Sequence, residues 1–290
     1  MPGIYRMTLI AQISDLHVYS PGKLAYGVVD TNSLVAEAIK QLSKLTPQPD
    51  AVVASGDLVH KGTPEDYEVL KTILAPLNCP LYLMPGNHDQ RDNLRRAFPS
   101  HPYLPGDINH LSYVVEAYPI CMIMLDSIVP GEGGGCVDAE RLSWLEQQLL
   151  AAPQTPTLIF IHHPPFATGI PWMDRNRFQG HGALANLIRQ HPQVKRVSCG
   201  HLHRGIYRAW AGTVASSQPS LVHQGAIDFA PESPSQFAME PPAYQLHIWT
   251  GETLISHTMY VGQFDGPYRF SDGKPVVAAD ASSLTTANTS

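Results

Sequence analysis

Aspartate, asparagine and histidine side chains recur in short motifs along the 290-residue chain. Carboxylate oxygen and imidazole nitrogen together suit divalent ions of intermediate softness, such as Mn, Fe, Co or Zn. The mixture is too rich in nitrogen for Ca or Mg, and it lacks the thiolates of a structural zinc site. About seven ligands are too many for one ion, so the motifs predict two ions bridged by one carboxylate. The motifs are Asp15-Leu16-His17, Gly56-Asp57, Gly86-Asn87-His88-Asp89, His162-His163 and His201-Leu202-His203.

Each motif closes a short, nearly continuous apolar run of the kind expected for a strand covered on both faces. Ligands of open α/β sheets bind beyond the carboxyl ends of the strands, so the motifs are expected to meet at one site. Asp15 and His17 are two residues apart, and continued strand geometry would point both side chains the same way. Glycines 56, 86 and 200 fit positive φ or a close backbone approach. The strand candidates are 9–14, 51–55, 81–84, 120–126, 157–162 and 196–199.

Helical patterns separate these strands. Capping residues stand just before apolar residues at helical spacing: Asp30 or Thr31, Thr63, and Asp138. They predict helices over 31–45, over 64–74 and after 138, and a fourth pattern predicts a helix over 181–190.

The pattern changes after Gly200, where short β-like stretches favour a second, more antiparallel sheet. These stretches lie near 206–211, 213–215, 244–249 and 253–260. Residues 218–242 contain five prolines and predict a long loop or lid. Residues 265–290, rich in Gly, Ser, Thr and Ala, predict a loosely ordered C-terminal tail.

The ordered set of motifs resembles the calcineurin-like metallophosphoesterase superfamily. Its local context, including Tyr26-Gly27-Val28-Val29-Asp30 and Val222-His223-Gln224, is similar to the class III cyclic-nucleotide phosphodiesterases and the related bacterial glycerophosphodiesterases. The resemblance spans roughly residues 8–225. It implies an α/β fold, a four-layer α/β/β/α sandwich with two mixed sheets. The catalytic domain would cover 1–264 and include the proline-rich loop.

The resemblance also implies roles for single residues. The choice of His162 over His163 rests on the resemblance alone. His88 and His223 are the catalytic candidates: with Asn87 they would bind the substrate, and either histidine could protonate the leaving alkoxide. One metal would bind Asp15, His17, Asp57 and His203, and the other would bind Asp57, Asn87, His162 and His201, with Asp57 as the bridge.

Several neighbouring residues have two interpretations each. Asp89 could orient His88 or cap a helix over 90–98. Tyr19, Lys23 and Tyr26 could line the substrate entrance or be solvated. Trp172 could stack on a base or anchor its own loop, and so could Arg175. Other histidines, His60 among them, have no partner motif and are interpreted as structural.

Charge counting favours a diester substrate. Two divalent cations, less two carboxylates and one bridging hydroxide, leave about one positive charge, which a phosphodiester monoanion neutralises. With the resemblance, this predicts a phosphodiesterase in which a metal-bound hydroxide attacks a small diester. The preferred substrates are 3′,5′-cyclic nucleotides, and glycerophosphodiesters or both classes are the alternative. A phosphomonoesterase or nuclease ranks lower, because few Lys or Arg residues lie near the motifs. A non-catalytic nucleotide-binding module ranks last, because no ligand is missing.

Composition limits the partners. The formal net charge is −6, from 19 basic and 25 acidic residues, and no basic run predicts a surface for long nucleic acids. No apolar stretch has the length of a membrane span, so no membrane insertion is expected. A start without a secretory pattern and four cysteines without a C-x-x-C pair predict a reduced, cytoplasmic protein. The loop 218–242 and the C-terminal strands could form a homo-oligomer contact, for a dimer or a larger assembly.

Overall fold

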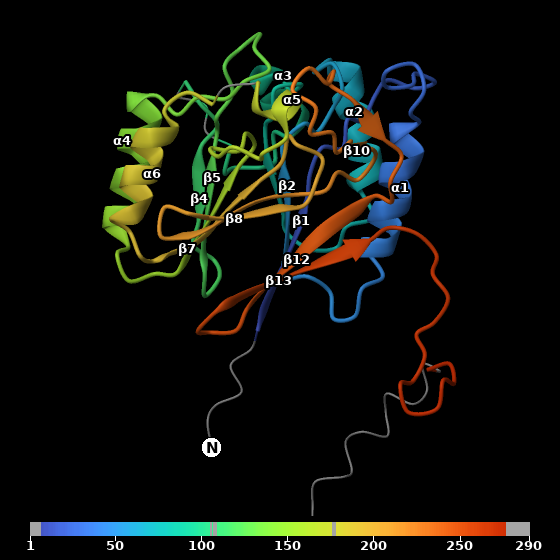
Figure 1. Ribbon diagram of the computed structural model, residues 1–290. Coiled ribbons are helices and arrows are strands. Elements are labelled where there is room, and N and C mark those ends of the chain that lie inside the picture. Colours follow the sequence, from blue (N-terminus) through green and yellow to red (C-terminus); the bar gives the residue numbers. More distant parts are fainter. Residues whose placement is uncertain (1–6, 105, 107–108, 176–177, 277–290) are drawn as a thin grey trace, which may run out of the picture.

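The computed structural model of the protein describes residues 7–104, 106, 109–175 and 178–276. Two sheets face each other at its centre, and helices lie on the outer side of each (Figure 1). The first sheet, in the order β13-β12-β1-β2-β3, contains β1 (Thr8–Ile13), β2 (Ala51–Ser55), β3 (Leu81–Met84), β12 (Ala243–Trp249) and β13 (Leu254–Tyr260). The second, in the order β4-β5-β6-β7-β9-β8, contains β4 (Tyr113–Val115), β5 (Cys121–Leu125), β6 (Thr157–Ile161), β7 (Val194–Cys199), β8 (Ile206–Trp210) and β9 (Thr213–Ser217).

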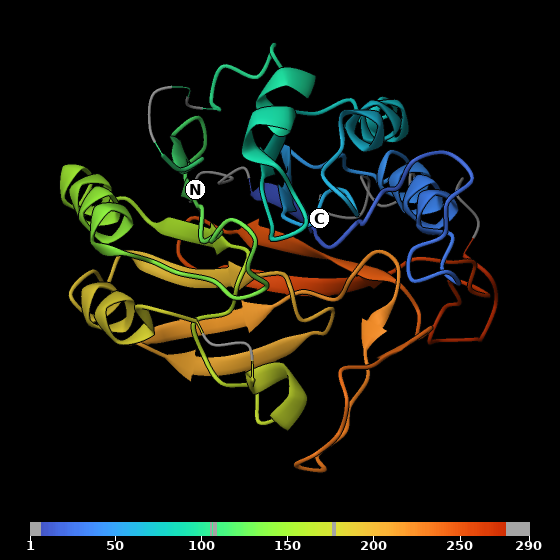
Figure 2. The same cartoon turned by 90° about the horizontal axis from the view of Figure 1, so that it is seen from above.

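The helices other than the short α5 (Pro171–Asp174) are divided between the two outer faces. Seen from above, α4 and α6 lie beside the second sheet, and the helices from the first hundred residues lie beside the first (Figure 2). The predicted caps are confirmed, since Asp30, Thr63 and Asp138 each accept a hydrogen bond from a backbone N–H of the following turn. The helices are α1 (Thr31–Leu42), α2 (Pro64–Leu74), α3 (Arg91–Ala97), α4 (Ala139–Ala151), α5 (Pro171–Asp174) and α6 (His181–Arg189).

Three hydrophobic clusters fill the three interfaces between these four layers. One packs α1 and α2 on the first sheet, with Ile39 and Leu70 fully buried. Another packs α4 and α6 on the second sheet around Leu145. The third lies between the sheets and includes Ile10 and Phe160. The central strands of each sheet, such as β2, β5 and β6, are covered on both faces and are therefore continuous apolar runs. The predicted four-layer α/β/β/α sandwich is confirmed.

The expectation that the stretches after Gly200 form a sheet of their own is wrong. Strand β9 joins the second sheet parallel to β7, and β8 follows it antiparallel. Strand β12 instead pairs antiparallel with β1 and completes the first sheet. The periodicity identified the strands, but their partners depend on which sheet edge is open, and sequence spacing does not encode that.

The predicted lid 218–242 has two unlike parts. Residues 218–225 are buried beneath the metal-binding loops, where the Ser220 hydroxyl donates to the carbonyl of Asp15 (2.8 Å) and Leu221 belongs to the first core. The more exposed part, 226–242, carries β11 (Phe237–Ala238), which pairs with β10 (Gln224–Gly225). Of the predicted tail, 265–276 is exposed, and 277–290 lies outside the described residues.

A buried hydrogen-bond network joins the two sheets. The Gln12 side chain on β1 donates to Ser55 (2.8 Å) and accepts from Ser198 on β7 (2.7 Å) and from His247 on β12 (2.9 Å). Burial, with a further effect from Arg196, lowers the pKa of His247 to about 3. No helix in the part of the chain described here is long and apolar enough to cross a membrane.

Candidate metal centre

The loops that follow β1 and β2 run side by side beyond the ends of these strands. The backbone N–H of Asp15 donates to Gly56 (3.0 Å), and that of His17 donates to Asp57 (2.9 Å). These hydrogen bonds continue the parallel pairing of the two strands into the site. Asp15, His17 and Asp57 are therefore held by the backbone of the sheet rather than by mobile loops.

Five candidate ligands have left-handed backbone conformations: φ is 54° at Asp15, 46° at His17, 48° at Asp57, 70° at His201 and 50° at His203. Residues other than glycine rarely adopt this region, and each such residue costs on the order of 1–3 kcal/mol. Left-handed backbone conformations at Asp15 and His17 thus bring both side chains to the same site. Strand geometry does not continue through this pair, so the condition under which both side chains would point the same way is not met.

The predicted need for glycine in these loops is confirmed. A Cβ atom on Gly56, where φ is +99°, would lie 2.3 Å from the His162 ring. A Cβ atom on Gly86 would meet the Asp57 carboxylate at 2.3 Å, and one on Gly200 would meet the Ser14 hydroxyl at 2.2 Å. Of the three, only Gly56 has a positive φ. Glycine is therefore required because the side chains of the ligands His162 and Asp57, and of Ser14, occupy the space that a further side chain would need.

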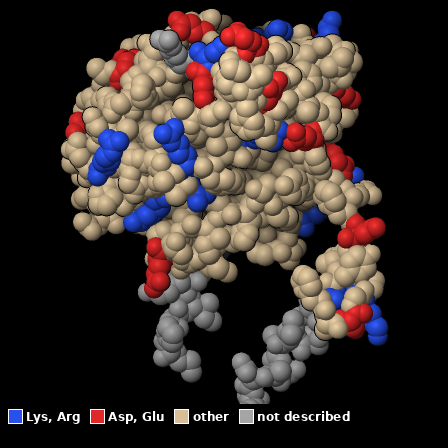
Figure 3. Space-filling model, viewed as in Figure 1, with Lys and Arg blue, Asp and Glu red and all other residues tan. Residues whose placement is uncertain are grey.

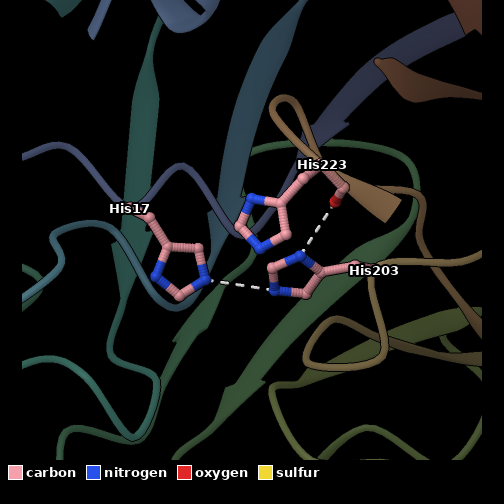
Figure 4. Close-up of side chains that lie close together, drawn as sticks. All are labelled: His17, His203 and His223. Carbon is pink, nitrogen blue, oxygen red and sulfur yellow. Dashed lines mark hydrogen bonds between the residues drawn. The ribbon is translucent and has the colours of Figure 1, made fainter. Parts of the chain in front are cut away.

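One predicted ligand set is assembled around His17. The Nε2 atoms of His17 and His203 face each other at 3.1 Å (Figure 4). Nε2 of His203 lies 3.4 Å from Asp15, and Nε2 of His17 lies 3.7 Å from Asp57. One ligand atom from each of these four residues lies within 4.8 Å of the others, and Asp15, His17 and Asp57 are fully buried or nearly so.

The other predicted set lies on the opposite side of Asp57. His162 Nε2 is 3.4 Å from Asp57 Oδ1 and 3.2 Å from Asn87 Oδ1. The same Asn87 oxygen lies 3.0 Å from His201 Nδ1. The two oxygens of Asp57 therefore face different groups of ligands, which is the position a bridging carboxylate requires.

Hydrogen bonds to the histidine rings fit metal binding. Nδ1 of His162 lies 2.9 Å from the carbonyl of Ser55, and Nδ1 of His203 lies 2.9 Å from that of His223. A carbonyl can only accept, so Nδ1 carries the proton and the Nε2 lone pair points into the site. Two Nε2 atoms that face each other with their lone pairs repel unless a cation or a proton lies between them. The donor set therefore fits two divalent ions.

Electrostatics support the same conclusion. Burial raises the pKa of Asp57, but the surrounding histidines outweigh that effect and hold it well below the usual range. Burial lowers the pKa of His162, yet the carboxylates of Asp57 and Asp15 prevail and raise it to about 9. In the metal-free chain a proton on His162 thus balances the buried carboxylates, and a metal ion would displace it.

The catalytic candidates border the same cavity. His88 Nδ1 lies 2.9 Å from the carbonyl of His60, and the His88 ring is 4.6 Å from that of His17. The His223 ring is 4.5 Å from that of His203, and its Nδ1 has no hydrogen-bond partner among the described residues. Both histidines and Asn87 line a cleft of about 340 Å³. His88 and His223 each keep one ring nitrogen available to a substrate.

Neither sequence interpretation of Asp89 is correct. Its carboxylate accepts from the backbone N–H of Gly86 (2.8 Å) and of Leu58 (3.0 Å) and from the Tyr67 hydroxyl (2.9 Å). The N-cap of α3 is Gln90, which makes no side-chain capping bond. Asp89 thus ties the Gly86–Asp89 turn to the loop that follows β2.

The structure adds residues that the motifs missed. His60, interpreted from the sequence as a surface or core histidine, is buried, and its ring lies 5.6 Å from that of His17 and stacks on that of His88 at 5.4 Å. The sequence feature that could have indicated this position is the spacing of three residues between Asp57 and His60. In the structure the backbone N–H of His60 donates to the carbonyl of Val18. Phe237 on β11 lines the cleft 4.7 Å from His223, and nothing in its sequence context marks it.

For the other residues with two interpretations, the structure shows which ones line the cleft. Tyr26 lines the cleft, and Tyr19 and Lys23 are not among its lining residues. Trp172 lines the cleft and also donates from Nε1 to the carbonyl of Ala226 (3.1 Å). Arg175 anchors the proline-rich segment through the carbonyl of Ser233.

The chain is similar to known phosphoesterases in sequence and in fold. Residues 8–205 match the model of the calcineurin-like phosphoesterases. The chain is 41% identical over 268 residues (92% of this chain, 98% of the relative) to a probable glycerophosphodiester phosphodiesterase of Arcobacter nitrofigilis. It is 34% identical over 222 residues (74% and 79%) to a 3′,5′-cyclic-nucleotide phosphodiesterase of a Nostoc species. The fold is similar to that of a dimetal phosphatase from Danio rerio, with a TM-score of 0.60 and 16% identity over 88% of this chain and 99% of that one.

Proposed function

Because the chain belongs to the calcineurin-like phosphoesterase family, we propose that its metal centre hydrolyses small phosphodiesters. In this proposal Asp57 bridges two divalent transition-metal ions. When bound, the ions would polarise the phosphate and lower the pKa of a water molecule so that it can attack. The first ion would bind Asp15, His17, Asp57 and His203, and the second would bind Asp57, Asn87, His162 and His201.

The residues that line the cleft favour a diester over a monoester as the substrate. Among its described lining residues there is no Lys or Arg. Arg204, the nearest basic residue after the last motif, is occupied by the carboxylate of Glu240 and the carbonyl of Gly225. A monoester dianion would need additional positive charge, whereas a diester monoanion balances the two ions and their carboxylates. This favours a phosphodiesterase over a phosphomonoesterase.

The chain's own groups would handle the phosphate and the proton. His88 is fixed through Nδ1, so its Nε2 can donate to a phosphate oxygen or to the leaving alkoxide. His223 lies across the cleft next to His203 and is the second candidate donor. Asn87 would hold the substrate from the side of the second ion.

Two classes of small diester fit the cleft. Tyr26, Trp172 and Phe237 place aromatic rings around it, which suits the planar base of a 3′,5′-cyclic nucleotide. Glycerophosphodiesters are the alternative, supported by the higher identity to a relative named for them. A nuclease is less well supported, since the face in Figure 3 shows scattered Lys and Arg rather than a basic stripe.

The test combines metal analysis with a substrate panel. We expect the purified protein, loaded with Mn²⁺, to bind two ions per chain and to hydrolyse cyclic AMP, glycerophosphoethanolamine or both. Chelation should abolish turnover. Asp57→Asn should lose metal and turnover together, whereas Asp92→Asn, an exposed carboxylate on α3, should match the wild type. Failure to hydrolyse any diester with two ions bound would overturn the proposal. Retained nucleotide affinity in an inactive Asp57→Asn variant would instead favour a binding module.

Self-association and a cytoplasmic setting complete the proposal. Ile227, Phe229 and Met239 are exposed on the proline-rich segment, which supports a contact between copies of this chain. All four cysteines are free, which suits a reducing compartment. Sedimentation of the wild type and of Phe229→Ser tests the contact: a dimer or larger assembly should dissociate in the variant, and a monomeric wild type would contradict it.

A further inference from the structure

A second cavity, of about 410 Å³, lies beside the metal cleft. His201, Leu202 and Met173 line both spaces. Gly133 lines the cleft, and the next two glycines of the same loop line the second cavity. His201 points Nδ1 at Asn87 and so forms part of the wall between them. The two spaces are thus neighbouring compartments that meet at the second ligand set.

The chemistry of this side cavity differs from that of the cleft. Phe166, Phe178 and Trp210 contribute aromatic rings, and Pro164 adds apolar surface. Its charged lining groups are Asp174, Arg208 and, if protonated, histidines. The Asp174 carboxylate accepts hydrogen bonds from the backbone N–H and the hydroxyl of Thr168 and from the backbone N–H of Gly169 (2.7–2.9 Å). The Arg208 side chain donates one hydrogen bond to the carbonyl of Ala167 (2.9 Å).

We propose that the side cavity binds a planar aromatic group carried on one free ester arm of an acyclic diester, such as an aryl ring. This rests on the proposed function and narrows its substrate class. An acyclic phosphodiester has two arms that diverge from the phosphorus, so a phosphate held at the metals can extend one arm past His201. The volume lies within the roughly 300–1,000 Å³ of small-molecule sites. The Arg208 guanidinium, which makes one side-chain hydrogen bond among the described residues, disfavours a cationic arm such as choline.

The Ala167→Trp variant tests the side cavity directly. Ala167 is exposed and lines the cavity, so a large side chain there should fill it with little effect on the core. KM should rise about tenfold or more for bis(4-nitrophenyl) phosphate, whose aryl arms diverge from the phosphorus. It should change little for cyclic AMP, whose two ester oxygens belong to one ribose and whose base is assigned to the rings of the cleft. It should change less than twofold for glycerophosphoethanolamine, whose arms carry no ring. Ala151→Trp is the matched control, because Ala151 is exposed at the end of α4 and lines neither the cleft nor the side cavity.

A second variant removes a ring instead of inserting one, so that a change in KM cannot be attributed to the bulk of the introduced tryptophan. Phe178→Leu removes an aromatic wall but keeps an apolar side chain, and it should raise KM three- to tenfold for the aryl diester only. Metal content should stay at the wild-type value in both variants. Equal changes for the aryl diester and for glycerophosphoethanolamine, or no change, would overturn the inference while leaving the proposed function intact. Absence of diester hydrolysis by the wild type would instead overturn the proposed function.

Discussion

His88 is fixed on one side by the carbonyl of His60 and borders the cleft on the other. If it donates the proton to the leaving group, His88→Gln keeps a polar side chain but removes the acid. We expect kcat to fall about 10²- to 10⁴-fold, with KM and metal content within twofold of the wild type. Steady-state kinetics and metal analysis on the same samples check this.

His257→Gln is the control for that substitution, because His257 is exposed on β13. It should leave kcat unchanged. Loss of metal from His88→Gln would show that His88 supports the ion site instead of acting on the substrate.

At the residue scale, the sequence predicted what short motifs can encode. Asp15, Asn87 and the paired histidines were found because each follows a strand and belongs to a recognisable set. The positions of His60 and Phe237 beside the candidate site were missed because they depend on loops that meet only in three dimensions. Whether each candidate ligand binds metal stays a prediction for the metal analysis to test.

Among the elements, the turn after β2 is the most constrained by packing. Gly56→Ala would combine a left-handed backbone with a Cβ 2.3 Å from the His162 ring. Backbone strain and overpacking each cost on the order of 1–3 kcal/mol. We therefore expect the free energy of unfolding to fall by roughly 3 kcal/mol and metal content to drop. Urea unfolding of the metal-free protein, with metal analysis of the loaded protein, measures both.

Gly131→Ala separates these two costs. Gly131 has a φ of +81°, but a Cβ there would meet nothing within 4 Å. It should lose only about 1 kcal/mol and retain its metal. Equal losses in the two variants would show that backbone strain, rather than the contact with His162, sets the requirement for glycine.

Elements with local signals were predicted well. The runs over 51–55 and 81–84 coincide with β2 and β3, and the capping residues of α1, α2 and α4 were identified. The partners of β9 and β12 were not, because pairing over a long sequence separation is decided by packing. The burial of 218–225 was also missed, because proline and polar residues there suggested an exposed loop.

For the whole molecule, the network between the sheets makes stability depend on pH. The pKa of His247 is about 3 in the folded chain and about 6.5 when unfolded. The unfolded chain alone binds this proton between those values, so the contribution of His247 is complete above pH 6.5 and falls towards pH 3. At pH 5 the loss is about 2 kcal/mol.

His247→Gln should remove that part of the pH dependence. Between pH 7 and pH 5 the free energy of unfolding should fall in both metal-free proteins. The fall should be about 2 kcal/mol smaller in the variant than in the wild type. Urea titrations at both pH values measure this difference. Identical losses would mean that His247 titrates in the folded chain as it does in the unfolded one.

The position of β12 also affects how the protein is made. Every candidate ligand precedes residue 225, yet β1, which leads into Asp15 and His17, has an open edge until β12 pairs with it. During translation the ligand-bearing segments therefore leave the ribosome before the sheet that supports them can close. We expect the nascent chain to acquire its ions late, after β12 emerges, and to present an unpaired strand edge to chaperones until then.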